Sequence, residues 1–297
     1  MRIFDPHIHM TSRTTDDYAA MAAAGVRALV EPSFWLGQPR TGVGTFTDYF
    51  DGLLGWEPHR ASQFGIRHHC ALALNPKEAN DPRLTGVLDL LPRYLAKDGV
   101  VAVGEIGYDS MTPAEDEAFA RQLELALHHG LPVLVHTPHR DKAVGTRRTL
   151  DVVRESGIDP ARVVVDHLTE GTVDMVAESG CWMGFSVYPQ TKMSEERMVR
   201  ILSRHGTERM LVNSAADWGH SDPLKTRATA DAMLAAGFGD DDVDRVMWRN
   251  PVSFYGQSGR LVLDAADDAA DEVTDARTGP EVPTVAYAGN SLARGGE

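Results

Sequence analysis

Histidines and carboxylates occur in this sequence in an arrangement typical of metal sites. His7 and His9 are two residues apart near the N-terminus, in a stretch, Arg2–His9, that is predicted to be a β-strand. Side chains at positions i and i+2 of a strand point to the same face, so we expect both imidazoles to project together. Further residues of ligand type follow at or just beyond the ends of later predicted strands: Glu105, His136, His167 and Asp217.

The spacing of these residues matches a repeating strand–helix unit. His136 follows Glu105 by 31 residues, and His167 follows His136 by another 31. Asp217 follows His167 by 50 residues, which leaves room for one more strand and its helix. In a barrel of parallel strands, the C-terminal rim brings side chains from separate strand ends to one mouth. The six side chains are therefore expected to converge there.

Short apolar runs alternate with helical segments along the chain. The predicted strands are Arg2–His9, Val26–Pro32, His68–Leu74, Val100–Glu105, Pro132–His136, Arg162–His167, Cys181–Ser186 and Met210–Ser214. The predicted helices are Asp16–Ala24, Phe46–Ser62, Leu84–Lys97, Pro113–His129, Asp141–Ser156, Thr169–Ser179, Ser194–Arg204 and Asp222–Ala236, with a ninth beginning at Asp241–Trp248. Continuous apolar runs are typical of strands buried on both faces. The pattern predicts an α/β fold, a (β/α)8 TIM barrel with a metal site at the C-terminal rim of its strands.

The last part of the sequence differs from the rest in composition. We expect the barrel to occupy residues 1–257 and an acidic C-terminal extension to occupy residues 258–297. From Asp264 onward the chain is acidic and then rich in Gly, Pro, Ala and Ser. Low hydrophobicity combined with charge predicts a solvated tail rather than another packed domain.

Composition and charge restrict the partners. The formal net charge of −14 opposes binding to a phosphate backbone and argues against a nucleic-acid partner. Cys70 and Cys181 lie in apolar stretches and suggest no disulfide framework, which fits a reducing cytoplasm. No signal peptide and no run of 18 apolar residues is visible, so no membrane association is expected. The expected partner is a small-molecule substrate, and homo-oligomerisation is left open.

The residue types suit hydrolysis assisted by two divalent ions. Two ions roughly 3.5–4 Å apart can share a hydroxide and clamp the group under attack. Imidazoles and carboxylates suit Zn²⁺, Mn²⁺, Mg²⁺ or Fe²⁺. Glu105 can bridge two such ions, and Asp217 can bind one ion and also take the proton from the attacking water.

Several motifs together resemble the amidohydrolase superfamily: His-x-His at the start, a histidine after Val-Leu-Val, another after Val-Val-Asp, and a late aspartate. The stretch Val103–Asp109 places a glutamate at the fourth strand and is most similar to TatD-type metal-dependent hydrolases. Asn250-Pro251 followed by Phe254 is similar to the helical end of those proteins. The resemblance covers residues 1–257 and implies a metal-dependent hydrolase.

The resemblance also implies a division of the ligands. One ion would be bound by His7, His9, Glu105 and Asp217, and the other by Glu105, His136 and His167. A hydroxide bridging this binuclear centre would attack an ester-type bond of a small molecule, such as a phosphoester, lactone or amide. Asp217 would be the catalytic residue that carries the proton.

Two stretches depart from the TatD-type pattern. Ser214–Asp217 stands where many members have Glu-Thr-Asp, and His136–Arg140 stands where they have His-x-Arg. These differences concern substrate contacts more than metal ligands, and together with the acidic charge they argue against nuclease activity. Two alternatives stay open: a non-hydrolytic barrel of the same ancestry, such as an isomerase or decarboxylase, and a metal-binding scaffold without turnover.

Polar residues beyond the strand ends are candidates for substrate binding. His139 and Arg140 follow the fifth strand and would bind an anionic group, although a solvated helix start explains them equally well. His220 follows the eighth strand, and Tyr188 and Lys192 follow the seventh, all on the same rim. His68 and His69 begin the third strand, so we expect them at the opposite end in a structural role.

Overall fold

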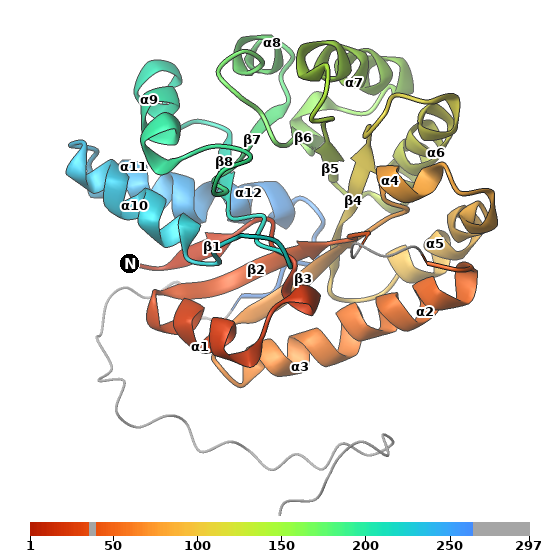
Figure 1. Ribbon diagram of the computed structural model, residues 1–297, viewed down its shortest axis with the longest axis horizontal. Helices are drawn as coiled ribbons and strands as arrows, with labels where there is room; N and C mark the ends of the chain where they lie inside the picture. Colours follow the sequence, from red (N-terminus) through yellow and green to blue (C-terminus); the bar gives the residue numbers. More distant parts are fainter. Residues whose placement is uncertain (36–39, 264–297) are drawn as a thin grey trace, which may run out of the picture.

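The computed structural model describes residues 1–35 and 40–263. One eight-stranded sheet lies at its centre, with neighbouring strands parallel and paired in chain order (Figure 1). The strands are β1 (Ile3–Asp5), β2 (Val26–Pro32), β3 (Arg67–Leu72), β4 (Val100–Gly107), β5 (Val133–His136), β6 (Val163–Val165), β7 (Trp182–Ser186) and β8 (Met210–Asn213). The predicted TIM barrel is confirmed.

Helices follow the strands around the outside of the sheet (Figure 1). The α-helices are α1 (Thr15–Ala23), α2 (Val43–Asp51), α3 (Glu57–Ser62), α4 (Pro76–Ala79), α5 (Val87–Leu95), α6 (Pro113–His129), α7 (Lys142–Ser156), α8 (Val173–Ala177), α9 (Glu195–His205), α10 (Lys225–Ala235), α11 (Asp240–Asp244) and α12 (Asn250–Gly256). Shorter 3₁₀ segments are η1 (Met10–Ser12), η3 (Pro82–Leu84) and η4 (Pro160–Arg162), and π-helical segments are η2 (Gly52–Trp56) and η5 (Arg245–Arg249). No helix in the described part of the chain has both the length and the apolar character needed to cross a membrane.

The helices differ from the sequence-based expectation in several bounds and in one added helix, α4, which was not predicted. The predicted helix Phe46–Ser62 starts three residues earlier, at Val43, and contains the π-helical segment η2. Its N-cap is Gly42, which has no side chain to accept a backbone N–H, so the sequence carries no capping signal there. Helix α4 is too short to show a period of its own, although the Asn75 side chain accepts a hydrogen bond from Lys77 N at 3.1 Å and marks its start.

Both faces of the strands are buried, as the apolar runs predict. In β6, Val163 and Val165 belong to the large core that the helices cover, whereas Val164 belongs to a smaller cluster inside the barrel. Leu134 in β5 and Leu211 in β8 belong to the same inner cluster. Alternation along each strand thus divides the apolar side chains between the barrel interior and its helical cover.

The helical segments η5 and α12 close the end of the barrel where the strands begin. Trp248, Phe254 and Tyr255 complete the inner cluster. The Asn250 side chain donates hydrogen bonds of 2.8 Å to the carbonyls of Thr207 and Met210, just before and at the start of β8. The apolar plug leaves the opposite rim as the open end of the barrel.

Residues 258–263 continue along this closed end. Leu261 and Leu263 pack against the inner cluster, and the backbone N–H of Val262 donates to His69 Nε2 at 3.2 Å. His68 is buried and contacts the Glu31 carboxylate at 2.8 Å. Both side chains thus make internal contacts, and the structural role expected for them stays a prediction. Residues 264–297 lie outside the described part, so the boundary at residue 257 stays a prediction.

The first and last strands approach each other at the open rim. Ala215 N donates to the carbonyl of His7, and His9 N donates to the carbonyl of Ala216, each at 2.9 Å. These bonds lie beyond the ends of β1 and β8, and they join the segments that carry the first and last predicted site residues.

The hydroxyl of Tyr255 links the apolar plug to the segment that leads into the site. It donates to the buried carbonyl of Pro6 at 2.6 Å. We expect Tyr255→Phe to lower the free energy of unfolding by about 1–3 kcal/mol, because it leaves a buried acceptor without its donor. Urea denaturation measures this change. Tyr94→Phe, which removes a bond to the exposed Asp51, is the control and should cost less. Equal stability of Tyr255→Phe and the parent protein would contradict the expectation.

Candidate metal centre

His7 and His9 lie just beyond β1 rather than within it. The strand ends at Asp5, so the predicted strand Arg2–His9 is too long. The bonds to β2 and to the segment after β8 continue past the strand end, from Ile8 N to Val30 O at 3.1 Å and from His9 N to Ala216 O at 2.9 Å. These backbone bonds fix the segment that carries both imidazole rings, and the Nε2 atoms of the two rings lie 3.0 Å apart.

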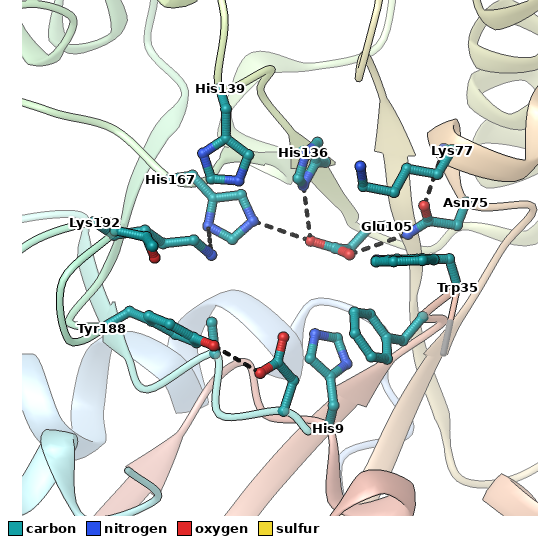
Figure 2. Close-up of a pocket in the computed structure, with 14 residues that line it drawn as sticks. His9, Trp35, Asn75, Lys77, Glu105, His136, His139, His167, Tyr188 and Lys192 are labelled. Atoms are coloured by element: carbon teal, nitrogen blue, oxygen red, sulfur yellow. Dashed lines mark hydrogen bonds and ion pairs between the residues drawn. The ribbon is translucent and has the colours of Figure 1, made fainter. Parts of the chain in front are cut away.

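Glu105, His136 and His167 form a second group from three adjacent strands. Glu105 lies in β4, His136 ends β5 and His167 follows β6. The Oε1 atom of Glu105 is 3.2 Å from His136 Nδ1 and 3.2 Å from His167 Nε2 (Figure 2). The same oxygen is 3.5 Å from His7 Nε2, so Glu105 belongs to both groups.

Hydrogen bonds behind the imidazoles fix which nitrogen faces the site. Asp166 Oδ2 is 2.6 Å from His7 Nδ1, and Ser186 Oγ is 2.6 Å from His167 Nδ1. In both rings Nε2 is therefore the nitrogen that faces Glu105. A carboxylate that receives the second N–H of a ligating histidine orients the ring and raises its basicity.

The donor set fits a divalent cation. The nitrogens that meet in the site are His7 Nε2 and His9 Nε2, 3.0 Å apart, and His136 Nδ1 and His167 Nε2, each 3.2 Å from Glu105 Oε1. Nitrogen ligands of one Zn²⁺ ion, each about 2.0–2.1 Å from it, lie about 3 Å apart, close to the separation of His7 and His9. Three groups of potential ligand atoms each lie within 4.8 Å of one another: two that share Glu105, His7–His9–Glu105 and Glu105–His136–His167, and a third, His7–Asp166–His167. Imidazole and carboxylate donors suit Zn²⁺, Mn²⁺ or Fe²⁺.

The electrostatics keep Glu105, His9 and His167 in the forms that bind cations. Burial alone would raise the pKa of Glu105, but His7 and His136 outweigh it and hold that pKa well below its usual value. Burial lowers the pKa of His9, helped by His7, and it lowers the pKa of His167, helped by Lys192. Glu105 is thus ionised and His9 and His167 are neutral near pH 7. The pKa of His7 is raised, because Glu105 and Asp166 outweigh the effect of burial.

Asp217 borders the same cavity but belongs to neither ligand group. Its Oδ1 atom accepts hydrogen bonds from the Tyr188 hydroxyl and from Gly219 N, each at 2.8 Å. The cavity measures about 360 Å³. Among its lining residues, Figure 2 shows Lys192 and Tyr188 on one side and Lys77, Asn75 and Trp35 on the other.

The residues predicted to bind substrate fall in different places. His139 lines the cavity, with its ring stacked at 6.5 Å from that of His167. Arg140 and His220 are exposed and are not among the residues that line the cavity. Tyr188 and Lys192 both line it. Substrate contact by any of these residues stays a prediction.

Sequence reasoning missed residues that support the ligands. Asp166 precedes His167 directly, and its place in the Val-Val-Val-Asp-His run was the available signal. Asn75 donates to Glu105 Oε2 at 3.1 Å, and Lys77 lines the cavity from the start of α4. Ser186 and Asn75 carry no motif, so only the folded chain reveals them.

A (β/α)8 barrel with histidines and a carboxylate gathered at its C-terminal rim has the architecture of a metal-dependent hydrolase. The chain belongs to the family described as "TatD related DNase", whose sequence model matches residues 4–255. The predicted relationship and the predicted enzyme class are confirmed.

Three similar proteins agree with this assignment. The chain is 24% identical over 257 residues to an uncharacterised metal-dependent hydrolase of Methanocaldococcus jannaschii, covering 85% of this chain and 99% of that protein. It is 33% identical over 163 residues to an uncharacterised metal-dependent hydrolase of Mycobacterium tuberculosis, covering 52% and 56% of the two chains. A crystal structure of a TatD-like protein from Archaeoglobus fulgidus superimposes with a TM-score of 0.72 at 26% identity, over 85% of this chain and 99% of that one.

Asp166 provides a test of the metal centre that leaves the groups His7–His9–Glu105 and Glu105–His136–His167 unchanged. We expect Asp166→Asn to weaken metal affinity about 10–100-fold, because it removes the carboxylate behind His7. Competition with a chromogenic chelator measures the affinity, and Asp174→Asn on the surface of α8 is the matched control.

A second variant perturbs Asp166 through its neighbour. A Cβ atom at Gly184 would lie 2.5 Å from Asp166 Oδ1 and 2.9 Å from its Cα, so Gly184→Ala must displace Asp166. It should weaken metal binding in the same direction. Parent-like affinity in both variants would contradict the role of Asp166.

Proposed function

We propose that this protein hydrolyses an ester-type bond of a small molecule, a phosphoester, lactone or amide, with the help of two divalent ions (Zn²⁺, Mn²⁺, Mg²⁺ or Fe²⁺). The observation that carries the proposal is the position of Glu105, which belongs both to the group with His7 and His9 and to the group with His136 and His167. A carboxylate shared by two sets of imidazoles suits a bridge between two ions.

Bound ions of this kind act as Lewis acids and lower the pKa of water to near neutrality. The protein's own task is to hold the reacting groups and to move the proton. We assign proton transfer to Asp217, which borders the cavity and whose Oδ1 atom is oriented by Tyr188 and Gly219. General acid–base catalysis by one such group contributes about 10²–10⁴-fold to rate.

The size of the cavity favours a small substrate. At about 360 Å³ it lies in the range of sites for small molecules. The net charge of −14 opposes a long polyanion, so we assign the site to small molecules although the family is described by a DNase name. Two cysteines that form no disulfide are in keeping with the cytoplasm as the proposed compartment.

Metal removal and reconstitution test the proposed activity. Protein stripped with a chelator is reloaded with Zn²⁺, Mn²⁺, Mg²⁺ or Fe²⁺ and assayed on bis-p-nitrophenyl phosphate, p-nitrophenyl phosphate, a simple lactone, an amide and single-stranded DNA. We expect two ions per chain and hydrolysis of a small substrate that disappears on stripping. One ion per chain without hydrolysis would favour the isomerase or decarboxylase alternative, and two ions without any turnover would favour a scaffold.

Asp217 separates catalysis from metal binding. We expect Asp217→Asn to reduce turnover by about 10²–10⁴-fold while the metal content stays near that of the parent protein, because Asp217 lies outside both ligand groups. Elemental analysis and kcat on the best substrate measure the two effects.

Tyr188→Phe is the companion variant and should reduce turnover less, since Gly219 N still holds the carboxylate. Parent-like turnover in Asp217→Asn would overturn the proton-transfer role. Loss of one ion in that variant would instead make Asp217 a ligand, as the family resemblance implies.

A further inference from the structure

The cavity contains a positive charge without a carboxylate partner. Lys192 follows β7 and its Nζ atom is 3.2 Å from His167 Nδ1. Among the described residues, no carboxylate lies within ion-pair distance of Lys192. Lys77 enters from the opposite side, paired with Asp109 at 2.9 Å (Figure 2). A partly buried cation that faces a cavity is stabilised by a ligand of opposite charge.

A continuous aromatic surface runs from the metal ligands to the rim. The Phe34 ring stacks on His9 with centroids 4.0 Å apart, and Trp35 contacts Phe34 at 5.9 Å. Trp218 is outside the cavity lining; it contacts Trp35 edge to face at 6.0 Å and is 56% exposed. Contact between water and an exposed tryptophan ring is unfavourable, and a ring stacked on this aromatic surface would remove apolar area from water.

The charge and the aromatic surface lie on different walls of one cavity. Figure 2 shows Lys192 beside His167 on one side and the Trp35 ring on the other. Lys77 joins the two features, because its Nζ atom is 5.1 Å from the Trp35 ring centroid. A ligand that satisfies both walls needs a negative group next to a flat apolar group, within a volume of about 360 Å³.

We propose that the cavity selects small substrates in which a negatively charged group lies next to a planar ring. Lys192, assisted by Lys77, binds the charge, and Trp35 binds the ring, with Trp218 supporting Trp35 from outside the cavity lining. This assignment rests on the proposed hydrolase function for the site, and it adds the substrate class and the residues that determine it. The negative group is a phosphoryl or a carboxylate group, which the following experiment distinguishes.

Binding of inert ligands tests the selection without turnover. Metal-loaded protein is titrated by calorimetry with phenylphosphonate, methylphosphonate, benzoate, acetate and benzyl alcohol. We expect each ring-bearing anion to bind about tenfold more tightly than its methyl counterpart, as ring stacking predicts. Benzyl alcohol should bind at least about tenfold more weakly than either ring-bearing anion, because it lacks the charge. The tighter of phenylphosphonate and benzoate identifies the negative group.

Variants of single residues test which side chains produce the preference for charge and which produce the preference for a ring. Lys192→Gln should weaken both phosphonates by the same factor and leave benzyl alcohol unchanged. Trp35→Leu and Trp218→Ala should instead reduce the ratio of the affinity for phenylphosphonate to the affinity for methylphosphonate toward one. Trp56→Ala, at a residue 52% exposed and outside the cavity lining, and Lys97→Gln, at a lysine stacked on Tyr94, are matched controls that should change neither preference. Metal content is measured for every variant, so that a lost ion is not mistaken for a lost contact.

The outcomes separate this proposal from the hydrolase proposal. Equal affinities for phenylphosphonate and methylphosphonate in the parent protein would overturn the ring preference, and benzyl alcohol binding as tightly as benzoate and phenylphosphonate would overturn the charge preference. A single-stranded oligonucleotide binding more tightly than phenylphosphonate would overturn the small-molecule class. Selective binding combined with no hydrolysis of any tested ester would reject the hydrolase function and leave the binding preference standing. The parent comparison decides the ligand class even if a variant fails to fold.

Discussion

The site depends on one buried carboxylate. Glu105 is 3% exposed and its Oε1 atom lies within 3.5 Å of imidazole nitrogens from β1, β5 and β6 segments. Transfer of an isolated carboxylate from water to such a place is costly, so the surrounding groups must compensate its charge. The scaffold meets this requirement by aligning strand ends, because no stretch of neighbouring residues could surround one oxygen from three directions.

The same constraint explains the asymmetry of the barrel. The end near Trp248 and Phe254 is filled by aromatic side chains and covered by Leu261 and Leu263, whereas the other end holds the polar groups. An apolar plug excludes water from below the site, which strengthens the interaction of Glu105 with its histidines. Tyr255 connects the two regions through its bond to Pro6, which lies directly after β1 and directly before His7.

Much of this arrangement could be predicted from the sequence, because barrel strands are buried on both faces and carry a clear apolar signal. His136 and Glu105 are examples, since each ends or nearly ends such a run and the 31-residue interval places both at one rim. Asp166 could have been recognised less easily, because an aspartate beside a histidine gives no indication of which ring it supports. The position of Arg140 and His220, exposed and outside the cavity lining, could not be predicted. Loop conformation follows no sequence period that would indicate where these side chains lie.

The grouping of positively charged side chains around the cavity also becomes visible only in the folded chain. Against a net charge of −14, Lys77 and Lys192 come from the third and seventh rim segments and face each other across one cavity. A local cluster of one sign within an oppositely charged protein concentrates the field where a ligand binds. Lys142 is not among the residues that line the cavity. It donates a hydrogen bond to the carbonyl of His167 at 2.8 Å and so stabilises the backbone just after β6.

The segment after β8 carries two of the residues given roles in the proposals, and they are consecutive in the sequence. Asp217 is bonded to Tyr188 within the cavity, while Trp218 extends outward to Trp35. Since the backbone joins them, the position of Trp218 against Trp35 and the position of Asp217, the proposed proton carrier, are set by the same loop. Arg13 strengthens this coupling by donating to the carbonyl of Asp217 at 3.0 Å and to Ser221 Oγ at 3.3 Å, which ties the loop to the start of the barrel. Under the two proposals, a change in this loop would therefore alter substrate preference and catalysis together.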